Sequence, residues 1–204
     1  MKRLASEVLP LRPLSGCVTQ AYISQRMQVA DLLEWILEQT GPADVRISSF
    51  SVSEEFLRRM YFIRQKKGAV RSLEIVLDFK ATNKTLILWP FIAQTVENCF
   101  LSSNHSKVML VRGESLSVAV VMSQNLTRGN RFETACITAD PEVYSALDKD
   151  FSDIVNFHSV HFHEIYHSTI GSDSTAGVDL PQADGNGNTS GRAGTGVQAG
   201  HKDS

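Results

Sequence analysis

Two continuous apolar runs, at 108–111 and 116–121, place the strongest constraint on the fold of this chain. Each run has the length of a β-strand, and Arg112, Gly113 and Glu114 between them suit a tight turn. Strands that are apolar at every position, instead of every second one, are usually buried on both faces of a sheet. The two runs therefore predict neighbouring buried strands in a sheet that is covered on both sides.

Helical patterns alternate with extended segments over the rest of the chain up to residue 167. Ser51 and Glu54 have the spacing of a capping box, and Asp140 and Pro141 supply an N-cap and a proline for the first helical position. The pattern predicts an α/β domain with a mixed central sheet covered by helices. The expected helices span 29–37, 52–63 and 143–158, and further strands are expected at 45–50, 73–79 and 132–138; 85–100 is left unassigned because Pro90 interrupts its apolar run.

Composition changes sharply near residue 168. From there to residue 204 the chain carries 8 of its 13 glycines and no Phe, Tyr or Trp. Such a segment cannot bury enough apolar surface to offset the entropy lost on ordering. We therefore expect one domain over 1–167 and a disordered tail over 168–204.

Charge and cysteine content limit the setting in which the protein acts. The formal net charge of -2 gives no global attraction for a polyanion, so nucleic acid would have to be held by a local patch. Three cysteines without metal-type spacing, and no apolar N-terminal segment, favour a cytoplasmic protein. The run 86–93 is far short of the roughly 20 apolar residues that span a bilayer, so no membrane association is expected.

Five polar residues flank the two apolar runs. His105 and Lys107 precede the first run, and two residues that are two apart on an extended strand point to the same face. Ser123, Asn125 and Glu133 follow the second run. A nucleophilic imidazole, a cation, hydrogen-bond donors and a carboxylate are together the groups needed to attack a phosphate ester.

The order of these residues resembles one half-site of the phospholipase D superfamily. It reads His-x-Lys, an apolar strand, a turn, a second apolar strand, Ser-x-Asn, then Gly-Asn and a glutamate, over 105–133. The resemblance implies the α-β-α sandwich of that family over about 27–165. It also implies a metal-independent phosphodiesterase with no cofactor, in which one histidine attacks phosphorus and a second protonates the leaving group. Because the chain holds one half-site, it is similar to the small nucleases of the family that form one active site per homodimer.

Carried over by position, the resemblance assigns a role to each residue of the motif. His105, Lys107 and Glu133 would be catalytic, with His105 the nucleophile or acid and Glu133 the group that orients it. Lys107, Ser123 and Asn125 would bind the phosphate. Two further residues in the same loop, Arg128 and Arg131, would contact a polyanion.

Two departures from the family pattern support a second hypothesis. Arg112 stands where the family has an aspartate, and Met122 stands where it usually has a glycine beside the phosphate-binding serine. Fold does not fix function. The alternative is therefore a phospholipase D-like module that binds nucleic acid or another phosphate ligand without cutting it.

A second motif, at 163–167, matches the H-E-x-x-H pattern of zinc proteases. His163 and His167 would lie one turn apart, at the end of a long helix that continues from 143–158 through the histidines. A catalytic zinc needs a third protein ligand, and the only later histidine is His201 in the expected tail. We therefore expect no bound metal.

Overall fold

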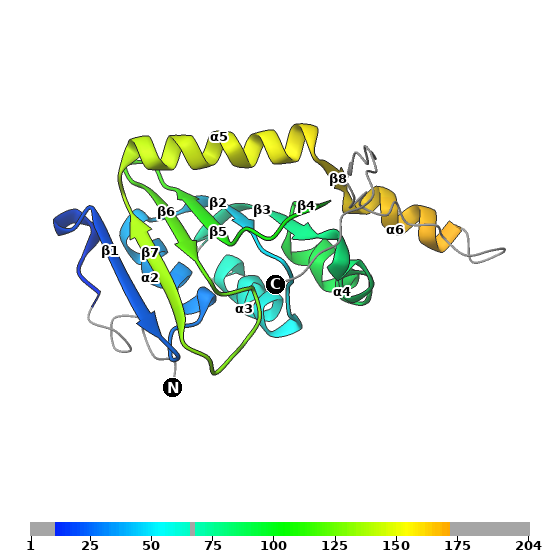
Figure 1. Ribbon diagram of the computed structural model, residues 1–204, viewed down its shortest axis with the longest axis horizontal. Helices are drawn as coiled ribbons and strands as arrows, with labels where there is room; N and C mark the ends of the chain where they lie inside the picture. Colours follow the sequence, from blue (N-terminus) through cyan, green and yellow to red (C-terminus); the bar gives the residue numbers. More distant parts are fainter. Residues whose placement is uncertain (1–10, 66–67, 172–204) are drawn as a thin grey trace, which may run out of the picture.

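The computed structural model describes residues 11–65 and 68–171 of the chain. Within these residues the strands form one mixed sheet in the order β1-β7-β6-β5-β2-β3-β4-β8 (Figure 1). The central strands β2, β3 and β4 are parallel, and every other neighbouring pair is antiparallel. The strands are β1 (Thr19–Ser24), β2 (Ala43–Ser48), β3 (Val70–Asp78), β4 (Asn98–Ser102), β5 (Val108–Arg112), β6 (Ser117–Met122), β7 (Glu133–Thr138) and β8 (Ser159–His161).

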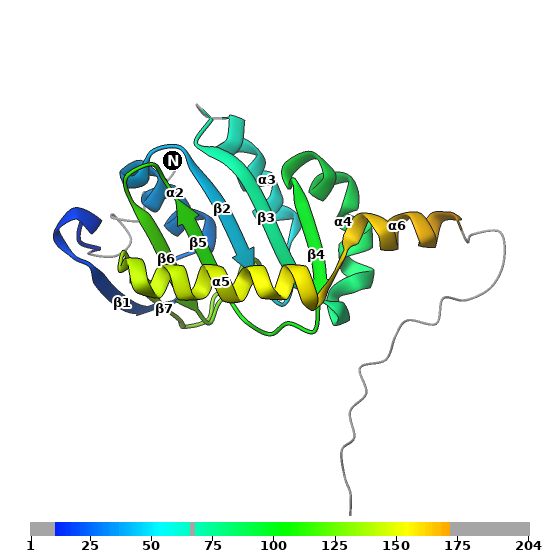
Figure 2. The ribbon, with the colours of Figure 1, turned by 90° about the horizontal axis from the view of Figure 1, so that it is seen from above.

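Helices cover both faces of this sheet, so the predicted α-β-α sandwich is confirmed. Helices α2, α3 and α4 lie below the sheet in Figure 1, and the long helix α5 lies above it. Figure 2 shows α5 crossing the strands from the β6 side toward β4. The helices are α2 (Val29–Thr40), α3 (Glu54–Gln65), α4 (Thr82–Thr95), α5 (Pro141–Phe157) and α6 (Phe162–Gly171), with short 3-10 helices at Leu14–Gly16 and Phe79–Ala81.

The two apolar runs form the neighbouring strands β5 and β6, as predicted. Met109, Leu110 and Val111 are fully buried, because their alternate side chains enter different hydrophobic clusters. The larger cluster lies between the sheet and α2, α3 and α4, and the smaller one includes Leu110, Tyr144 and Phe151 beneath α5. The residues with continuous hydrophobicity thus connect two layers of core.

The helix starts were predicted with mixed success. Asp140 caps α5 as expected, since its carboxylate accepts from the backbone N–H groups of Glu142 and Val143 at 2.9 and 3.1 Å. The capping box at Ser51 is wrong. Helix α3 begins at Glu54, and the Ser53 hydroxyl accepts from the backbone of Phe56 at 3.3 Å.

Two other segments differ from the sequence expectations. The unassigned segment becomes α4, which contains Pro90, followed by β4. The long helix expected to run through the histidines ends at Phe157, because 159–161 pair with β4 as strand β8 before α6 begins. Helix α6 includes the first four residues of the expected tail, and 172–204 lie outside the described residues. No helix in the described ranges is long and apolar enough to span a membrane.

Candidate active site

The residues of the predicted half-site gather at one edge of the sheet. The parallel strands β2, β3 and β4 end at this edge, and the antiparallel strand β5 begins there (Figure 2). Loops 49–53, 103–107 and 123–132 therefore meet around it. The carboxyl ends of parallel strands are the usual position of ligand sites in open α/β sheets.

His105 and Lys107 lie in the loop before β5, and not on the strand as expected. The His105 side chain is exposed, with its ring edge-on to Phe50 at a centroid distance of 5.7 Å. The Lys107 ammonium donates to the backbone carbonyl of His105 at 2.8 Å. A local hydrogen bond, and not strand alternation, therefore holds the ammonium at the backbone of His105.

Asn104, which the sequence reasoning missed, anchors the loop that carries His105. Its side chain is buried and its carbonyl oxygen accepts from the backbone N–H and hydroxyl of Ser106, at 3.0 and 2.6 Å, and from the Ser48 hydroxyl at 3.1 Å. Its amide nitrogen donates to the carbonyls of Ser49 and Val76 at 3.2 and 3.4 Å. One amide therefore ties the loop after β4 to the ends of β2 and β3.

Asp78, also missed, joins the same three segments through its backbone and side chain. Its carboxylate accepts from the backbone of Asn104 at 2.9 Å and of Lys80 at 2.7 Å, and its own N–H donates to the Phe50 carbonyl at 3.2 Å. The sequence signals were weak: Asp78 is a single acid after an apolar strand, and Asn104 directly precedes His105. Their importance comes from contacts between distant segments.

Ser123 and Glu133 contact each other directly. The Ser123 hydroxyl donates to the Glu133 carboxylate and accepts from the backbone of Thr134 at 3.0 Å. No hydrogen bond joins Glu133 to His105 within the part of the chain that the structure describes, so the expected orienting contact is not formed here. The pKa of Tyr22 is raised by its burial and by the nearby Glu133 charge.

Asn125 points toward the loop after β2. Its carbonyl oxygen accepts from the backbone of Phe50 at 3.3 Å and from the Ser49 hydroxyl at 3.4 Å. Its amide nitrogen donates to no described residue and is left available for a ligand oxygen. Ser123 and Asn125 therefore lie at the same edge but have turned to different partners.

Of the two departures from the family pattern, Met122 lies at the half-site, where its N–H donates to the backbone carbonyl of Lys107 at 3.0 Å. Met122 is 8% exposed and packs in the hydrophobic core. Arg112 is the last residue of β5 and lies five residues after Lys107, which corresponds to roughly 17 Å at the usual rise per residue of a strand. There it forms an ion pair with Asp148, and its guanidinium lies 5.6 Å from the centre of the Tyr144 ring. The Met122 side chain packs into the core, and Arg112 lies at the opposite end of β5 from Lys107.

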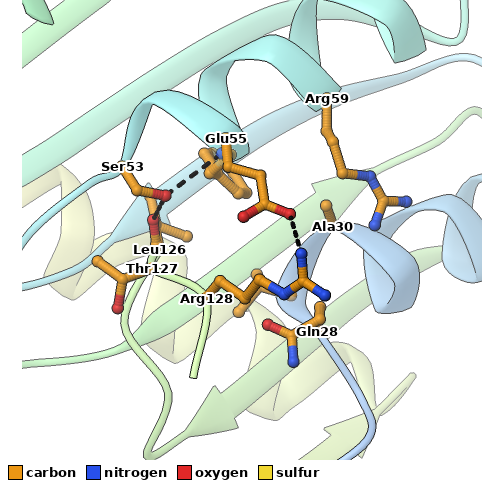
Figure 3. Close-up of a pocket in the computed structure, with 10 residues that line it drawn as sticks. Gln28, Ala30, Ser53, Glu55, Arg59, Leu126, Thr127 and Arg128 are labelled. Atoms are coloured by element: carbon orange, nitrogen blue, oxygen red, sulfur yellow. Dashed lines mark hydrogen bonds and ion pairs between the residues drawn. The ribbon is translucent and has the colours of Figure 1, made fainter. Parts of the chain in front are cut away.

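The expected polyanion contacts, Arg128 and Arg131, belong to the loop between β6 and β7. Arg128 pairs with Glu55 at 3.1 Å across a small hollow of about 30 Å³ between α2, α3 and this loop (Figure 3). Such a hollow has room for a water molecule and not for a nucleotide. Arg131 is 81% exposed and lies 3.9 Å from Glu133. Of the two arginines, Arg131 is the more open to a ligand.

The H-E-x-x-H motif lies on α6, separate from the half-site. The ring of His163 is 6.3 Å from Trp89 and 6.2 Å from His161, and the His167 side chain lies outside the described part. No group of three potential metal ligands occurs among the described residues.

Comparisons with known proteins agree with this architecture. No protein-family model and no curated protein matches the chain. Among solved structures, it is similar to Nuc from Salmonella typhimurium, a phospholipase D family member, with a TM-score of 0.54 and 17% identity over 69% of this chain and 95% of that one. It is also similar to NucT from Helicobacter pylori, with a TM-score of 0.51 and 15% identity over 69% and 96% of the two chains. At these identities the likeness establishes the fold.

Proposed function

We propose that this chain, which has the phospholipase D fold, is a metal-independent phosphodiesterase that cuts nucleic acid as a homodimer. One observation carries the proposal. The exposed imidazole of His105 lies at the carboxyl edge of the sheet, its ring nitrogens make no hydrogen bond to a described residue, and the Lys107 ammonium is bonded to the carbonyl of the same residue. The names of Nuc and NucT and their fold add support for a reaction on nucleic acid.

In the proposed reaction a ring nitrogen of His105 attacks the phosphorus of a phosphodiester. The N–P bond forms as the P–O bond to the leaving nucleoside breaks, and His105 of the partner subunit gives its proton to the leaving oxygen. Water then attacks the phosphohistidine, the same partner histidine takes the water's proton, and the N–P bond breaks. Lys107 and the amide of Asn125 would stabilise the charge on the phosphoryl oxygens.

Glu133 is proposed to stabilise the cationic ring of His105. Its side chain is only 15% exposed and accepts from Ser123 at the same edge of the sheet. The proposal therefore requires a change of partner, in which the Ser123 hydroxyl turns to a phosphate oxygen and the carboxylate turns to His105. Such hydrogen bonds often tighten only in the substrate complex.

The alternative function, a module that binds phosphate without cutting, is favoured by those same internal contacts. Ser123 already has Glu133 as a partner, and Lys107 already has the His105 carbonyl. If these contacts persist when a ligand binds, the positive charge of Lys107 would still attract a phosphate, but Ser123 and Glu133 could not take up their catalytic roles.

Cleavage of single- and double-stranded DNA in EDTA tests the proposal. We expect the wild type to cut in EDTA, His105→Ala to lose cleavage, and the control His158→Ala, which replaces another exposed histidine, to keep it. Salt-sensitive binding without cleavage would instead support the binding module, and activity that requires added zinc would contradict both. A strictly monomeric mass in solution would contradict the shared site.

A further inference from the structure

Three phenylalanines are placed along the edge that carries the half-site. Phe50 is half-buried two residues after β2, Phe79 is 37% exposed directly after β3, and Phe132 is 72% exposed directly before β7. Large apolar side chains in such positions are not needed for the core. They leave aromatic faces and edges available to a ligand at this edge.

The positions of Phe50 and Phe79 are fixed relative to His105. The Phe50 ring contacts the imidazole at 5.7 Å, and the Phe50 carbonyl accepts from Asp78, the residue before Phe79. The same Asp78 carboxylate binds the backbone of Asn104, the residue before His105. The two aromatic residues and the nucleophile are therefore carried by three loops that are bonded together.

A basic residue accompanies each aromatic position. Lys80 follows Phe79, Arg131 precedes Phe132, and the Lys107 ammonium donates to the carbonyl of His105, whose ring contacts Phe50. Lys80 is exposed and forms no ion pair with any described residue. Arg131 is 81% exposed, with its nearest carboxylate oxygen at 3.9 Å. The chain has a net charge of -2, so these cations form a local track and not part of a general positive field.

The spacing of this track suits a chain of nucleotides. Strands β7 and β3 are four steps apart in the sheet order, which is roughly 19 Å at the usual separation of about 4.8 Å per strand. His105, between them, is where the scissile phosphate would lie. Aromatic residues and cations would thus flank the phosphate on both sides.

We infer that this edge binds single-stranded nucleic acid, with bases against Phe50, Phe79 and Phe132 and phosphates against the adjacent cations. This inference rests on the proposed function for the position of the reacting phosphate. The physical reason is that a base in a duplex is stacked on its neighbours and cannot place its face on a protein ring, whereas a base in a single strand can. The edge therefore prefers a single strand to a duplex of the same sequence.

Binding of nucleic acid by the variant His105→Ala, which is expected not to cleave, tests the inference separately from the reaction. Fluorescence anisotropy in EDTA would compare a labelled single-stranded oligonucleotide with its duplex. Adding Phe79→Ala or Phe132→Ala is expected to raise the Kd for the single strand roughly 5- to 140-fold. The matched control Phe62→Ala removes a 69% exposed phenylalanine near the far end of α3 and is expected to leave Kd unchanged.

A lysine pair completes the experiment. Lys80→Ala is expected to reduce the slope of log affinity against log salt by about 0.7, the value for one phosphate contact in a single strand. The control Lys149→Ala, which replaces a 73% exposed lysine, is expected to leave the slope unchanged. Equal Kd values for duplex and single strand would overturn the inference even if the enzyme cuts. So would Phe79→Ala and Phe132→Ala variants that fold normally by circular dichroism and bind the single strand with unchanged Kd. Aromatic-dependent binding without wild-type cleavage would support the inference and remove the proposed reaction.

Discussion

Replacing Asn104 by alanine is expected to destabilise the protein by about 3 kcal/mol. Five hydrogen bonds end on the buried amide. Two of these five bonds can be replaced without the amide, since the Val76 carbonyl also accepts from Ser49 and one of the Ser48 and Ser106 hydroxyls can donate to the other. About three bonds are lost outright, at about 1 kcal/mol each.

Urea unfolding measured by tryptophan fluorescence checks this value. The control is Ser103→Ala, an exposed neighbour in the same loop, whose free energy of unfolding should change by less than about 0.5 kcal/mol. Asn104→Ala should also lose cleavage at temperatures where it is folded, because the loop that carries His105 loses its attachment to β2 and β3. A variant as stable as Ser103→Ala would refute the energetic argument, and a destabilised variant with full cleavage would refute the positioning role.

Three further predictions concern other parts of the molecule. Asp140→Ala removes the cap of α5 and should lower the free energy of unfolding by about 1 kcal/mol in urea, with no change in cleavage. Arg112→Asp, which restores the family's aspartate, should leave cleavage unchanged and lower stability by about 1–2 kcal/mol because it faces Asp148; higher activity would show that the departure matters. Burial raises the pKa of Cys99 to about 12, so at pH 8 a thiol reagent should modify exposed Cys136 quickly and Cys99 only on unfolding. Because burial keeps the Cys99 thiol protonated in the folded protein only, the free energy of unfolding should fall as the pH rises above about 9.

The layers and the sheet could be predicted because local patterns agree with the tertiary structure. Continuous apolar runs mark the doubly buried strands β5 and β6, and Asp140 with Pro141 marks the start of α5 through contacts inside one turn. The resemblance at 105–133 predicted the fold for a related reason. Its polar residues flank two buried strands that are adjacent in sequence and pair with each other as the β5–β6 hairpin.

Other features depend on contacts between distant segments. Pairing of 159–161 with β4 interrupts the long helix, and the Phe100 and His161 rings meet at 5.0 Å, which no periodicity indicates. Asn104 and Asp78 hold the site through partners up to 56 residues away. Glu133 bonds to Ser123 and not to His105, because pairing of β6 with β7 places Ser123 and Glu133 next to each other.

The most direct test of the central claim is to look for the covalent intermediate on His105. The protein would be mixed with an oligonucleotide in EDTA, quenched at short times under alkaline conditions that preserve a phosphohistidine, and digested for peptide mass spectrometry. We predict a nucleotidyl group on the peptide that contains His105, absent from His105→Ala. An adduct on another residue, or cleavage that persists in His105→Ala, would contradict the proposed reaction.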